Sequence, residues 1–509
     1  MQFKKYLFFT TFFGSLLFTV FLAQCPNYYA WQNKPANYFY SGQASWFDPW
    51  DVNVYVAAIK WGQTGQLLLK NLYTTQTYSN ILFYPVYTVV GLAFASVNPF
   101  LLFQVLSAVC GVLLFVGIYL FAWIFIKDRW LALLATVLTA LGGGLGWLFF
   151  PNIPSADLLI TSFTFQSAWQ RPHEAIGMMW YFCSLYLFYY YFSTKKIIYS
   201  FLSLACLLVL VVFYPYYLAT YGLILGSFLY LHKDTAKNIY DFSLLGLNII
   251  LTLFITVFYF DYLVSGGFAG VAGQTLSRPP LVSLFLGYGL FMPIVIYQLT
   301  RWKTILPDRR FLLIWVFVSL SLSFLPIGIA RFYLRGLFLP LSILVVFALK
   351  ELKINSPVKL SLAIVVILFL SLPSSLYIFY RRVKETRTIN PWYYQPRAAD
   401  EMFDYLQMTN KDGVLAGYTL GNYLPAHTGK SVYFGHLIQT PQATEKLYNL
   451  EIFYQGKLQK KEALQFLRYN KINFVVYGHE EKQWGKLKYP FLHQVFSSKE
   501  IVLYEVVGK

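Results

Sequence analysis

Long apolar runs, separated by short polar segments, make up most of the chain before residue 380. A helix needs about 20 apolar residues to cross the hydrocarbon core of a bilayer, and most of these runs approach that length. Lipid offers the backbone no hydrogen-bond partners, so the runs are expected as helices. The pattern predicts about eleven spanning helices, in a range of roughly ten to thirteen. They are expected at Tyr6–Ala23, Leu101–Ile126, Leu131–Phe149, Ala175–Tyr191, Ile197–Phe213, Tyr216–Leu231, Phe242–Leu263, Leu281–Leu299, Phe311–Ile329, Gly336–Leu349 and Leu360–Tyr380.

One further apolar stretch, Ile81–Val97, decides the predicted orientation. Read as a span, it places several lysines and arginines outside, against their tendency to stay in the cytoplasm. Read as a helix lying in the outer interface, it leaves 15 Lys and Arg in the inner segments and 7 in the outer loops. We therefore predict a multi-pass protein of the cell membrane with a cytoplasmic amino terminus and an extracytoplasmic carboxyl terminus.

Two segments depart from the apolar pattern. Residues 24–100 form the first predicted outer loop, which is too long for a connector and too aromatic for disorder. After residue 380 the charge content becomes that of a soluble domain, and short helix and strand patterns alternate. We predict a membrane domain over residues 1–380 and a small extracytoplasmic α/β domain over residues 381–509. The expected elements of the latter are helices near Ala398–Met408 and Lys461–Tyr469 and strands near Val414–Ala416, Asn473–Tyr477 and Ile501–Val506.

Composition supports the membrane assignment. The chain is 57% hydrophobic and 12% charged, whereas a soluble globular chain has about a quarter charged residues. The net charge of +18 does not indicate nucleic-acid binding, because most of the excess lies in short loops between apolar runs, where it reports orientation. The four cysteines show no CxxC spacing, so neither a zinc site nor a disulfide framework is expected.

The first predicted outer loop carries the strongest candidates for chemistry, Asp48, Asp51 and Tyr55. A short amphipathic helix is expected over Val54–Leu69, and Asp51 stands where an N-cap residue belongs, with its carboxylate on free backbone N–H groups. The alternative is a carboxylate at the membrane surface that acts as a general base or a metal ligand. Spacing alone gives the two interpretations equal weight.

The stretch from Asp51 to Tyr55, with Gly65 and Leu68–Tyr73 downstream, resembles the first external loop of GT-C glycosyltransferases. It is similar to uncharacterised bacterial members and to the mannosyltransferase and aminoarabinose transferase types. The resemblance implies a many-helix GT-C fold and inverting transfer of a hexose or pentose from a polyprenyl-phosphate donor. A glycan, a lipid or a protein is the implied acceptor.

The same resemblance assigns roles within the loop. It gives Asp51 the catalytic acidic position, Asp48 an assisting position and Tyr55 the aromatic position. Family members commonly have an acidic residue directly after the Asp, and Val52 stands there in this chain. A requirement for a divalent cation, Mg²⁺ or Mn²⁺, is therefore left open.

Two arginines, Arg331 and Arg335, lie in a short segment that the predicted topology places outside, against the positive-inside bias. They either snorkel to lipid headgroups or stabilise the charge of a departing lipid phosphate. An Arg followed by aromatic residues and then Pro340 resembles the lipid-phosphate-binding element of the GT-C family. That resemblance makes Arg331 the first candidate for binding the lipid phosphate and Arg335 the second.

Another predicted outer loop ends in Arg171, His173 and Glu174, at the mouth of a predicted span. Ionisable groups at such a place are unfavourable unless they are exposed or used. The segment resembles one that recurs in uncharacterised bacterial members of the superfamily, which implies binding of the sugar, the acceptor or a metal ion. Residues of a hydrated loop are an equal alternative.

Three functions follow as hypotheses. The first is a glycosyltransferase that takes a sugar from a polyprenyl-phosphate donor at the outer face of the membrane, with membrane lipid and an envelope acceptor as partners and no nucleic acid. The second is a transporter or flippase of lipid-linked glycans, which is expected to carry ionisable residues along its spans. The third is a non-catalytic envelope-assembly protein. The predicted spans hold few ionisable residues, which favours the enzyme.

Overall fold

The computed structural model describes residues 2–232, 239–351 and 356–508, which divide into two compact units. The first unit consists of residues 1–25, 106–258 and 275–382, and the second of residues 26–105, 259–274 and 383–509. The boundary predicted at residue 380 is close to the one at residue 382. Residues 26–105 group with the carboxyl-terminal part of the chain rather than with the remainder of residues 1–380.

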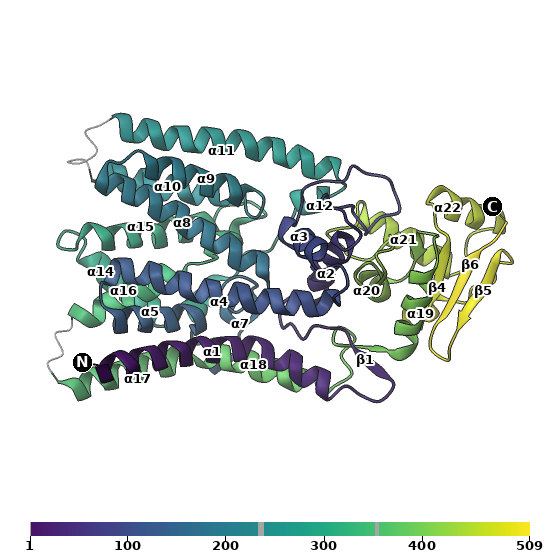
Figure 1. The fold of residues 1–509 in the computed structure, drawn as a ribbon, viewed down its shortest axis with the longest axis horizontal. Coiled ribbons are helices and arrows are strands. Elements are labelled where there is room, and N and C mark those ends of the chain that lie inside the picture. The colour runs from purple at the N-terminus through teal and green to yellow at the C-terminus, as the bar shows by residue number, and fades with distance from the viewer. Residues whose placement is uncertain (1, 233–238, 352–355, 509) are drawn as a thin grey trace. The chain divides into compact units, whose positions relative to one another are not determined.

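The first unit is a bundle of helices (Figure 1). Pairs of neighbours pack along it, and aromatic side chains fill its core: the rings of Tyr181 and Tyr217 stack with centroids 4.1 Å apart, and Trp315 is fully buried. The helices of this unit are α5 (Arg129–Leu141), α6 (Gly146–Phe149), α7 (Ala156–Leu159), α8 (Pro172–Thr194), α9 (Ile198–Val211), α10 (Tyr217–Leu231), α13 (Leu281–Tyr288), α14 (Phe291–Thr300), α15 (Pro307–Ser323), the 3₁₀ helix η1 (Ala330–Leu334), α16 (Phe338–Glu351) and α17 (Pro357–Ser371). Four more contribute residues to both units: α1 (Gln2–Gln32), α4 (Pro99–Ile126), α11 (Ile239–Ser265) and α18 (Pro373–Glu385).

Local sequence signals explain where several of these helices begin. Proline stands in the first turn of α8, α15 and α17, where its missing N–H leaves no helical hydrogen bond unmade. Ahead of α5, the Asp128 carboxylate accepts the backbone N–H groups of Trp130 and Leu131, both at 3.0 Å. These contacts satisfy donors that have no partner within the helix.

Five helical segments among the described residues are long and apolar enough to cross a membrane, and seven if each of two bent pairs counts as one span. In the bent pairs, α13 meets α14 at 89° and α17 meets α18 at 41°. Helices α9 and α10 are apolar but shorter. Each of the eleven predicted segments contains helix, but eleven spans are not confirmed.

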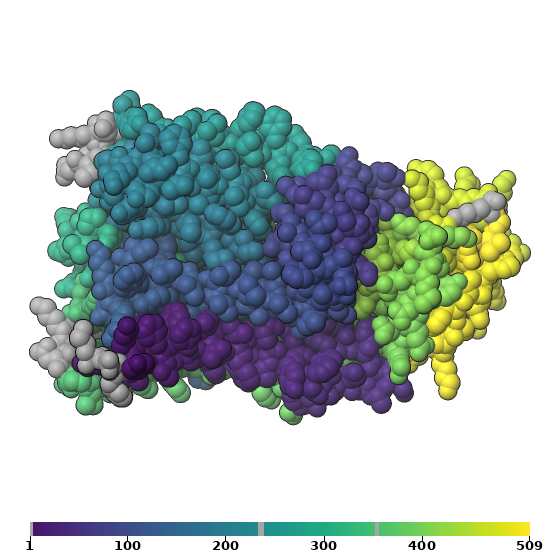
Figure 2. All heavy atoms as spheres, in the orientation of Figure 1, coloured from purple at the N-terminus to yellow at the C-terminus, as the bar shows by residue number. Residues whose placement is uncertain are grey.

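Apolar side chains also cover part of the surface of the first unit. Leu17 and Phe21, one turn apart on α1, are 67% and 53% exposed, and Ile250 and Phe254 on α11 are 66% and 59% exposed. The space-filling view shows α1 at the surface (Figure 2). Large apolar patches are rare on soluble monomers, and stripes of this kind are expected where helices face lipid.

The second unit combines an amino-proximal segment with a small α/β domain. The segment contributes β1 (Tyr38–Tyr40), α2 (Pro49–Gly62) and α3 (Pro85–Ala93), and residues 259–274 contribute α12 (Ala269–Ala272). The α/β domain contributes β2 (Tyr394–Pro396), α19 (Arg397–Met408), β3 (Val414–Leu415), α20 (Tyr418–Thr428), α21 (Ala443–Tyr454), α22 (Lys460–Tyr469), β4 (Phe474–Tyr477), α23 (His479–Trp484), β5 (Leu492–Ser497) and β6 (Val502–Val506). The predicted sheet-containing carboxyl-terminal region is confirmed.

Two sheets organise this unit. The larger has the order β3-β4-β6-β5, with β3 and β4 parallel and the other neighbours antiparallel (Figure 1). In the smaller, β1 pairs antiparallel with β2, so that Tyr38 faces Pro396 and Tyr40 faces Tyr394. The second pairing ties residues near the amino end of the chain to the start of the α/β domain.

Helices α2 and α3 pack closely through two glycines. A Cβ on Gly62 would lie 2.2 Å from the carbonyl oxygen of Thr88, and one on Gly91 would lie 2.1 Å from that of Ile59. Helix α2 begins at Pro49 and ends at Gly62, earlier at both ends than the expected Val54–Leu69. Helix α3 has nine residues, which at 1.5 Å per residue is too short to cross a bilayer.

A buried carboxylate links β3 to the helix that follows β4. Glu481 is fully buried, and its two oxygens accept the backbone N–H groups of Gly417 at 2.6 Å and Gly478 at 2.9 Å. Burial raises the pKa of Glu481 to about 7, against an ordinary value of 4.5. The folded protein therefore holds this proton more tightly than the unfolded chain does.

This shift predicts a pH dependence of stability. The contribution of Glu481 is fully present below the unfolded pKa and is lost as the pH rises through about 7. We expect the melting temperature of the purified protein to fall between pH 5 and pH 8, and to fall less in Glu481→Gln. The informative quantity is the change in melting temperature with pH in each protein. The absolute melting temperatures differ for another reason, because the side-chain NH₂ group of the Glu481→Gln variant faces a backbone N–H donor at every pH. Equal slopes in the two proteins contradict the prediction.

Candidate functional site

Asp51 lies in the first turn of α2, in the second unit. The prediction that it is the N-cap residue is wrong: Asp48 is the N-cap residue, with the left-handed backbone angle φ 40°, and makes no side-chain capping bond. Pro49 starts the helix, where its missing N–H leaves no helical hydrogen bond unmade. The Asp51 backbone N–H donates to the Asp48 carbonyl oxygen at 3.0 Å, and the Asp51 side chain is 23% exposed.

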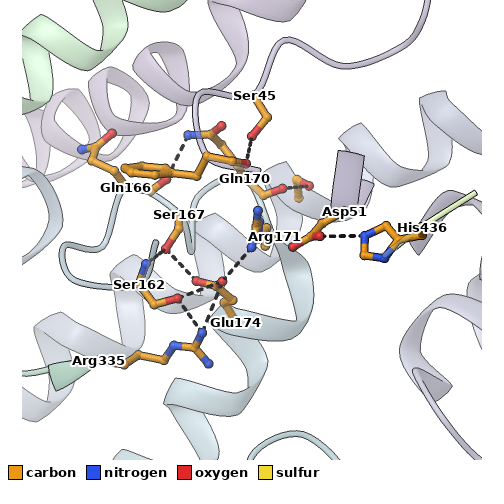
Figure 3. Close-up of polar contacts among 12 residues, drawn as sticks. Ser45, Asp51, Ser162, Gln166, Ser167, Gln170, Arg171, Glu174, Arg335 and His436 are labelled. Carbon is orange, nitrogen blue, oxygen red and sulfur yellow. Dashed lines mark hydrogen bonds and ion pairs between the residues drawn. The ribbon is translucent and has the colours of Figure 1, made fainter. Parts of the chain in front are cut away.

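The Asp51 carboxylate pairs with His436 of the α/β domain (Figure 3). Their Oδ1 and Nε2 atoms are 3.0 Å apart, and the imidazole is 3% exposed. On the other side of the ring, Nδ1 accepts the backbone N–H groups of Ile438 at 3.2 Å and Gln439 at 3.3 Å. Since Nδ1 is an acceptor, the proton of the neutral ring is on Nε2, which donates to Asp51.

Further contacts hold α2 against α20. Asn53 donates through Nδ2 to Oδ1 of Asn422 at 2.8 Å, and both residues are fully buried. The amide of Asn422 donates to the Gly435 carbonyl oxygen at 3.3 Å, and the Tyr73 hydroxyl donates to the Asn422 carbonyl oxygen at 3.2 Å. The hydrogen bonds that position α2, the helix of Asp51, thus also fix Gly435, the residue before His436.

Tyr55 lies inside this packing rather than at its surface. It is 5% exposed, and its ring stacks on Tyr87 with centroids 5.2 Å apart and meets Tyr84 edge-on at 5.3 Å. Its ring contacts α3 and the residue before it, so in this structure it supports the position of α2.

A separate buried cluster surrounds Glu174 in the first unit, at the start of α8 (Figure 3). The carboxylate, 1% exposed, accepts the hydroxyls of Ser162 at 3.0 Å and Ser167 at 2.7 Å. It also lies 3.5 Å from both Arg171 Nη1 and Arg335 Nη2. We call these five residues the Glu174 cluster. It joins the segment before α8 to the segment between η1 and α16.

Arg335 is held on several sides within the protein. It donates through Nη1 to the Tyr216 hydroxyl at 2.9 Å and through Nη2 to the Ser162 hydroxyl at 2.5 Å. Its guanidinium carbon lies 4.1 Å from the ring centre of Tyr214. Arg331, by contrast, is half-buried, with its guanidinium carbon 5.8 Å from the ring centre of Phe332.

The hydrated-loop interpretation of Arg171, His173 and Glu174 is wrong in this structure. All three are buried, with exposures of 4%, 7% and 1%. His173 lies beside Tyr214, with ring centroids 6.1 Å apart. Burial of these charges is made tolerable by the ion pairs and hydroxyl contacts of the Glu174 cluster.

No group of three His, Cys, Asp or Glu side chains close enough to hold a metal ion is found in the described ranges 2–232, 239–351 and 356–508. Next to Asp51 stands Val52 instead of a second carboxylate, and Oδ1 of Asp51 receives an N–H from His436. The described residues around Asp51 thus lack a group of three ligating side chains, a poor fit to the several oxygen ligands that Mg²⁺ and Mn²⁺ prefer.

The structure brings together Arg171, Glu174 and Arg335 from two distant segments, and Asp51 with His436. The sequence pointed to Arg171 and Glu174 in one motif and to Arg335 in another, and it offered no sign of His436. Gly435, the residue before His436, packs against Gly421 so closely that a Cβ there would lie 2.2 Å from the Gly421 carbonyl oxygen.

No family model matches the chain, and no curated protein does. Solved structures of an oligosaccharyltransferase from the archaeon Archaeoglobus fulgidus do match. The apo crystal structure aligns with a TM-score of 0.59 and 12% identity, over 95% of this chain and 72% of that one. The oligosaccharyltransferase AglB from the same archaeon, in complex with an inhibitory peptide and a dolichol-phosphate, aligns with a TM-score of 0.58 and 12% identity, over 95% and 70%. The complex with Zn and sulfate aligns with a TM-score of 0.56 and 12% identity, over 97% and 73%. At this identity the likeness is one of fold.

Proposed function

We propose that this chain, which has the GT-C fold of an archaeal oligosaccharyltransferase, is a membrane glycosyltransferase that uses a lipid-linked saccharide. The proposed donor is a sugar on a polyprenyl phosphate, and the proposed acceptor is a glycan, lipid or protein of the cell envelope. The amino terminus is proposed to be cytoplasmic and the carboxyl-terminal domain extracytoplasmic. The dolichol-phosphate and peptide bound by the similar oligosaccharyltransferase support a lipid donor and a separate acceptor.

The observation that carries this proposal is the Asp51 carboxylate. It combines partial exposure with a fixed hydrogen bond from a buried His436, which is the arrangement expected of a group that must hold one orientation and still reach a substrate. The GT-C resemblance assigns the catalytic position to the same residue. Asp48, half-buried at the start of the same helix, is proposed as an assisting neighbour.

The proposed reaction is a single displacement at the anomeric carbon. Asp51 takes the proton of the acceptor hydroxyl or amide as the acceptor atom bonds to the anomeric carbon, and the bond from that carbon to the lipid phosphate oxygen breaks with inversion. Negative charge develops on the departing phosphate, which needs a nearby cation. The Nε2–H of His436 donates a hydrogen bond to the Asp51 carboxylate, which stabilises the carboxylate before the transfer without neutralising it.

Arg331 is proposed to hold the departing phosphate. Arg335 already donates to Tyr216 and Ser162 and pairs with Glu174 within the protein, and the GT-C resemblance places Arg331 first for this role. Arg171, His173 and Glu174 are proposed to shape the sugar or acceptor site through the Glu174 cluster. No step here is assigned to a divalent cation, because the residues around Asp51 fit one poorly, although a similar structure was solved in complex with Zn and sulfate.

His436 is expected to act as a positioning residue for Asp51. We expect His436→Phe to lower kcat by about 100-fold with little change in KM for the donor, because a displaced base loses proximity rather than binding. His436→Gln retains a donor toward Asp51 and is expected to recover most of that loss. His493→Phe, at an exposed position on β5, serves as the control. A rise in KM with unchanged kcat contradicts the assigned role.

Deletion of the gene tests the function in the cell. We expect a polyprenyl-phosphate saccharide to accumulate in the deletion strain and to return to its normal level when the wild-type chain is restored, as measured by mass spectrometry of extracted lipids. A non-catalytic assembly protein predicts no accumulation. An unchanged lipid-linked saccharide pool therefore contradicts the proposal.

A further inference from the structure

A polar cavity lies in the second unit, between α21, α22 and Gln76 of the amino-proximal segment. Its volume is about 550 Å³, within the range typical of small-molecule sites. Side-chain amides are the commonest polar groups in its lining. The lining residues are Gln76, Tyr433, Gln442, Glu445, Lys446, Asn449, Glu462, Gln465, Phe466, Tyr469 and Asn470.

Aromatic rings form the apolar part of this wall. Tyr433 and Phe466 meet edge-on with centroids 5.3 Å apart, which leaves part of the Phe466 ring at the half-buried surface of the cavity. Tyr469 follows one turn later on α22 and is 83% exposed. An aromatic side chain so open to solvent at the edge of a polar cavity is available to cover a ligand.

The charged groups of the cavity do not make it an anion site. Lys446 is 3% exposed, donates to the Thr74 hydroxyl at 2.9 Å and lies 5.3 Å from the ring centre of Tyr433. Burial lowers the pKa of Lys446 to about 8, so the amine still carries its charge near neutral pH. Glu445 and Glu462 add two carboxylates to the lining, and Glu462 also accepts the Gln459 backbone N–H at 3.0 Å.

We propose that this cavity binds a neutral oligosaccharide. Side-chain amides both donate and accept, as neighbouring sugar hydroxyls require, and the C–H faces of a sugar ring pack on aromatic rings such as those of Phe466 and Tyr469. The volume suits a short chain of sugars rather than a polymer surface. An anionic sugar is disfavoured, because the lining carries two carboxylates and one buried amine.

The site is distinct from the Asp51 site and does not depend on transfer at Asp51. It includes the amino-proximal segment, since Gln76 lines the cavity and the Thr74 hydroxyl accepts a hydrogen bond from the lining residue Lys446. Binding is therefore measurable on the full chain without a lipid donor. Failure of the binding test and failure of the proposed transfer are separate results.

The test is calorimetric titration of the purified full chain with four neutral probes: maltotriose, mannotriose, chitotriose and galactotriose. Trigalacturonate and a neutral hexapeptide are titrated for comparison. We expect saturable binding of at least one neutral probe. Tyr469→Ala and Gln465→Ala are each expected to weaken it about tenfold, and Asp51→Asn to leave it unchanged. The matched control is Tyr448→Ala, because Tyr448 is 63% exposed on α21 and does not line the cavity.

Three results overturn the proposal. The first is no binding of any neutral probe by a folded wild-type chain. The second is binding of trigalacturonate or the peptide in place of the neutral sugars. The third is full binding by Tyr469→Ala and Gln465→Ala, or equal loss in Tyr448→Ala, either of which places the sugar elsewhere.

Discussion

Asp51→Asn is expected to reach normal abundance and to lose transfer from the lipid-linked donor by about 1,000-fold. Asparagine has the shape of aspartate, and its Oδ1 can still accept the Nε2–H of His436 that lies 3.0 Å from the carboxylate oxygen. The local fold is therefore preserved, and only the charge and the proton acceptor are removed. Steady-state kinetics of purified protein, with abundance followed in membranes, measure both effects.

Two further variants sharpen this result. Asp404→Asn changes an exposed aspartate on α19 and is expected to leave transfer unchanged. Asp48→Asn alters the proposed assisting residue at the N-cap of α2, and its transfer rate is expected to lie between those of Asp51→Asn and Asp404→Asn. Wild-type rates in Asp51→Asn remove Asp51 from the mechanism.

Glu174→Ala is expected to cause a large loss of stability. The carboxylate is 1% exposed and pairs with two guanidiniums that are each 4% exposed. Its removal leaves both positive charges buried without their shared anion, which typically costs about 3–5 kcal/mol. Thermal unfolding of the purified protein, and its abundance in membranes, are expected to report the loss.

An exposed ion pair of the same chain provides the matched control. Arg397 and Glu401 are 76% and 58% exposed, with their N and O atoms 3.9 Å apart, so Glu401→Ala is expected to change stability by less than about 0.5 kcal/mol. Glu174→Ala combined with Arg335→Met is expected to be less destabilising than the sum of the single changes. Equal melting temperatures for Glu174→Ala and Glu401→Ala contradict the account of the cluster.

The apolar pattern predicted the positions of the helices well, because a lipid-facing segment must satisfy its own backbone hydrogen bonds and is therefore encoded by a long apolar run. It did not predict where spans bend. The predicted span Leu281–Leu299 is two helices meeting at 89°, with Gly289 at φ 49° between them. The predicted span Leu360–Tyr380 bends at Pro373, where the α18 helix begins. Such bends depend on packing against neighbours as well as on hydropathy.

The site was predictable only in part. The GT-C fold implied by the loop around Asp51 is confirmed by the structural likeness, while the catalytic roles stay proposals. The sequence did not indicate His436, because its contact with Asp51 spans 385 positions and leaves no local pattern. For the charged residues at the start of α8, a hydrated loop was an equal alternative to a binding site. The sequence shows that these ionisable groups are adjacent, but not that Glu174 pairs with Arg335, 161 positions away.

The central claim is that this chain breaks the bond between a sugar and a lipid phosphate. The most direct test reconstitutes the purified chain in liposomes with lipid-linked saccharides extracted from the native cells and with an envelope fraction as acceptor. Mass spectrometry then follows the lipid. The account predicts that the wild-type chain releases polyprenyl phosphate while the sugar appears on the acceptor, and that Asp51→Asn does neither. A lipid-linked saccharide that crosses the bilayer intact, with no released lipid phosphate, would contradict the account and favour a transporter.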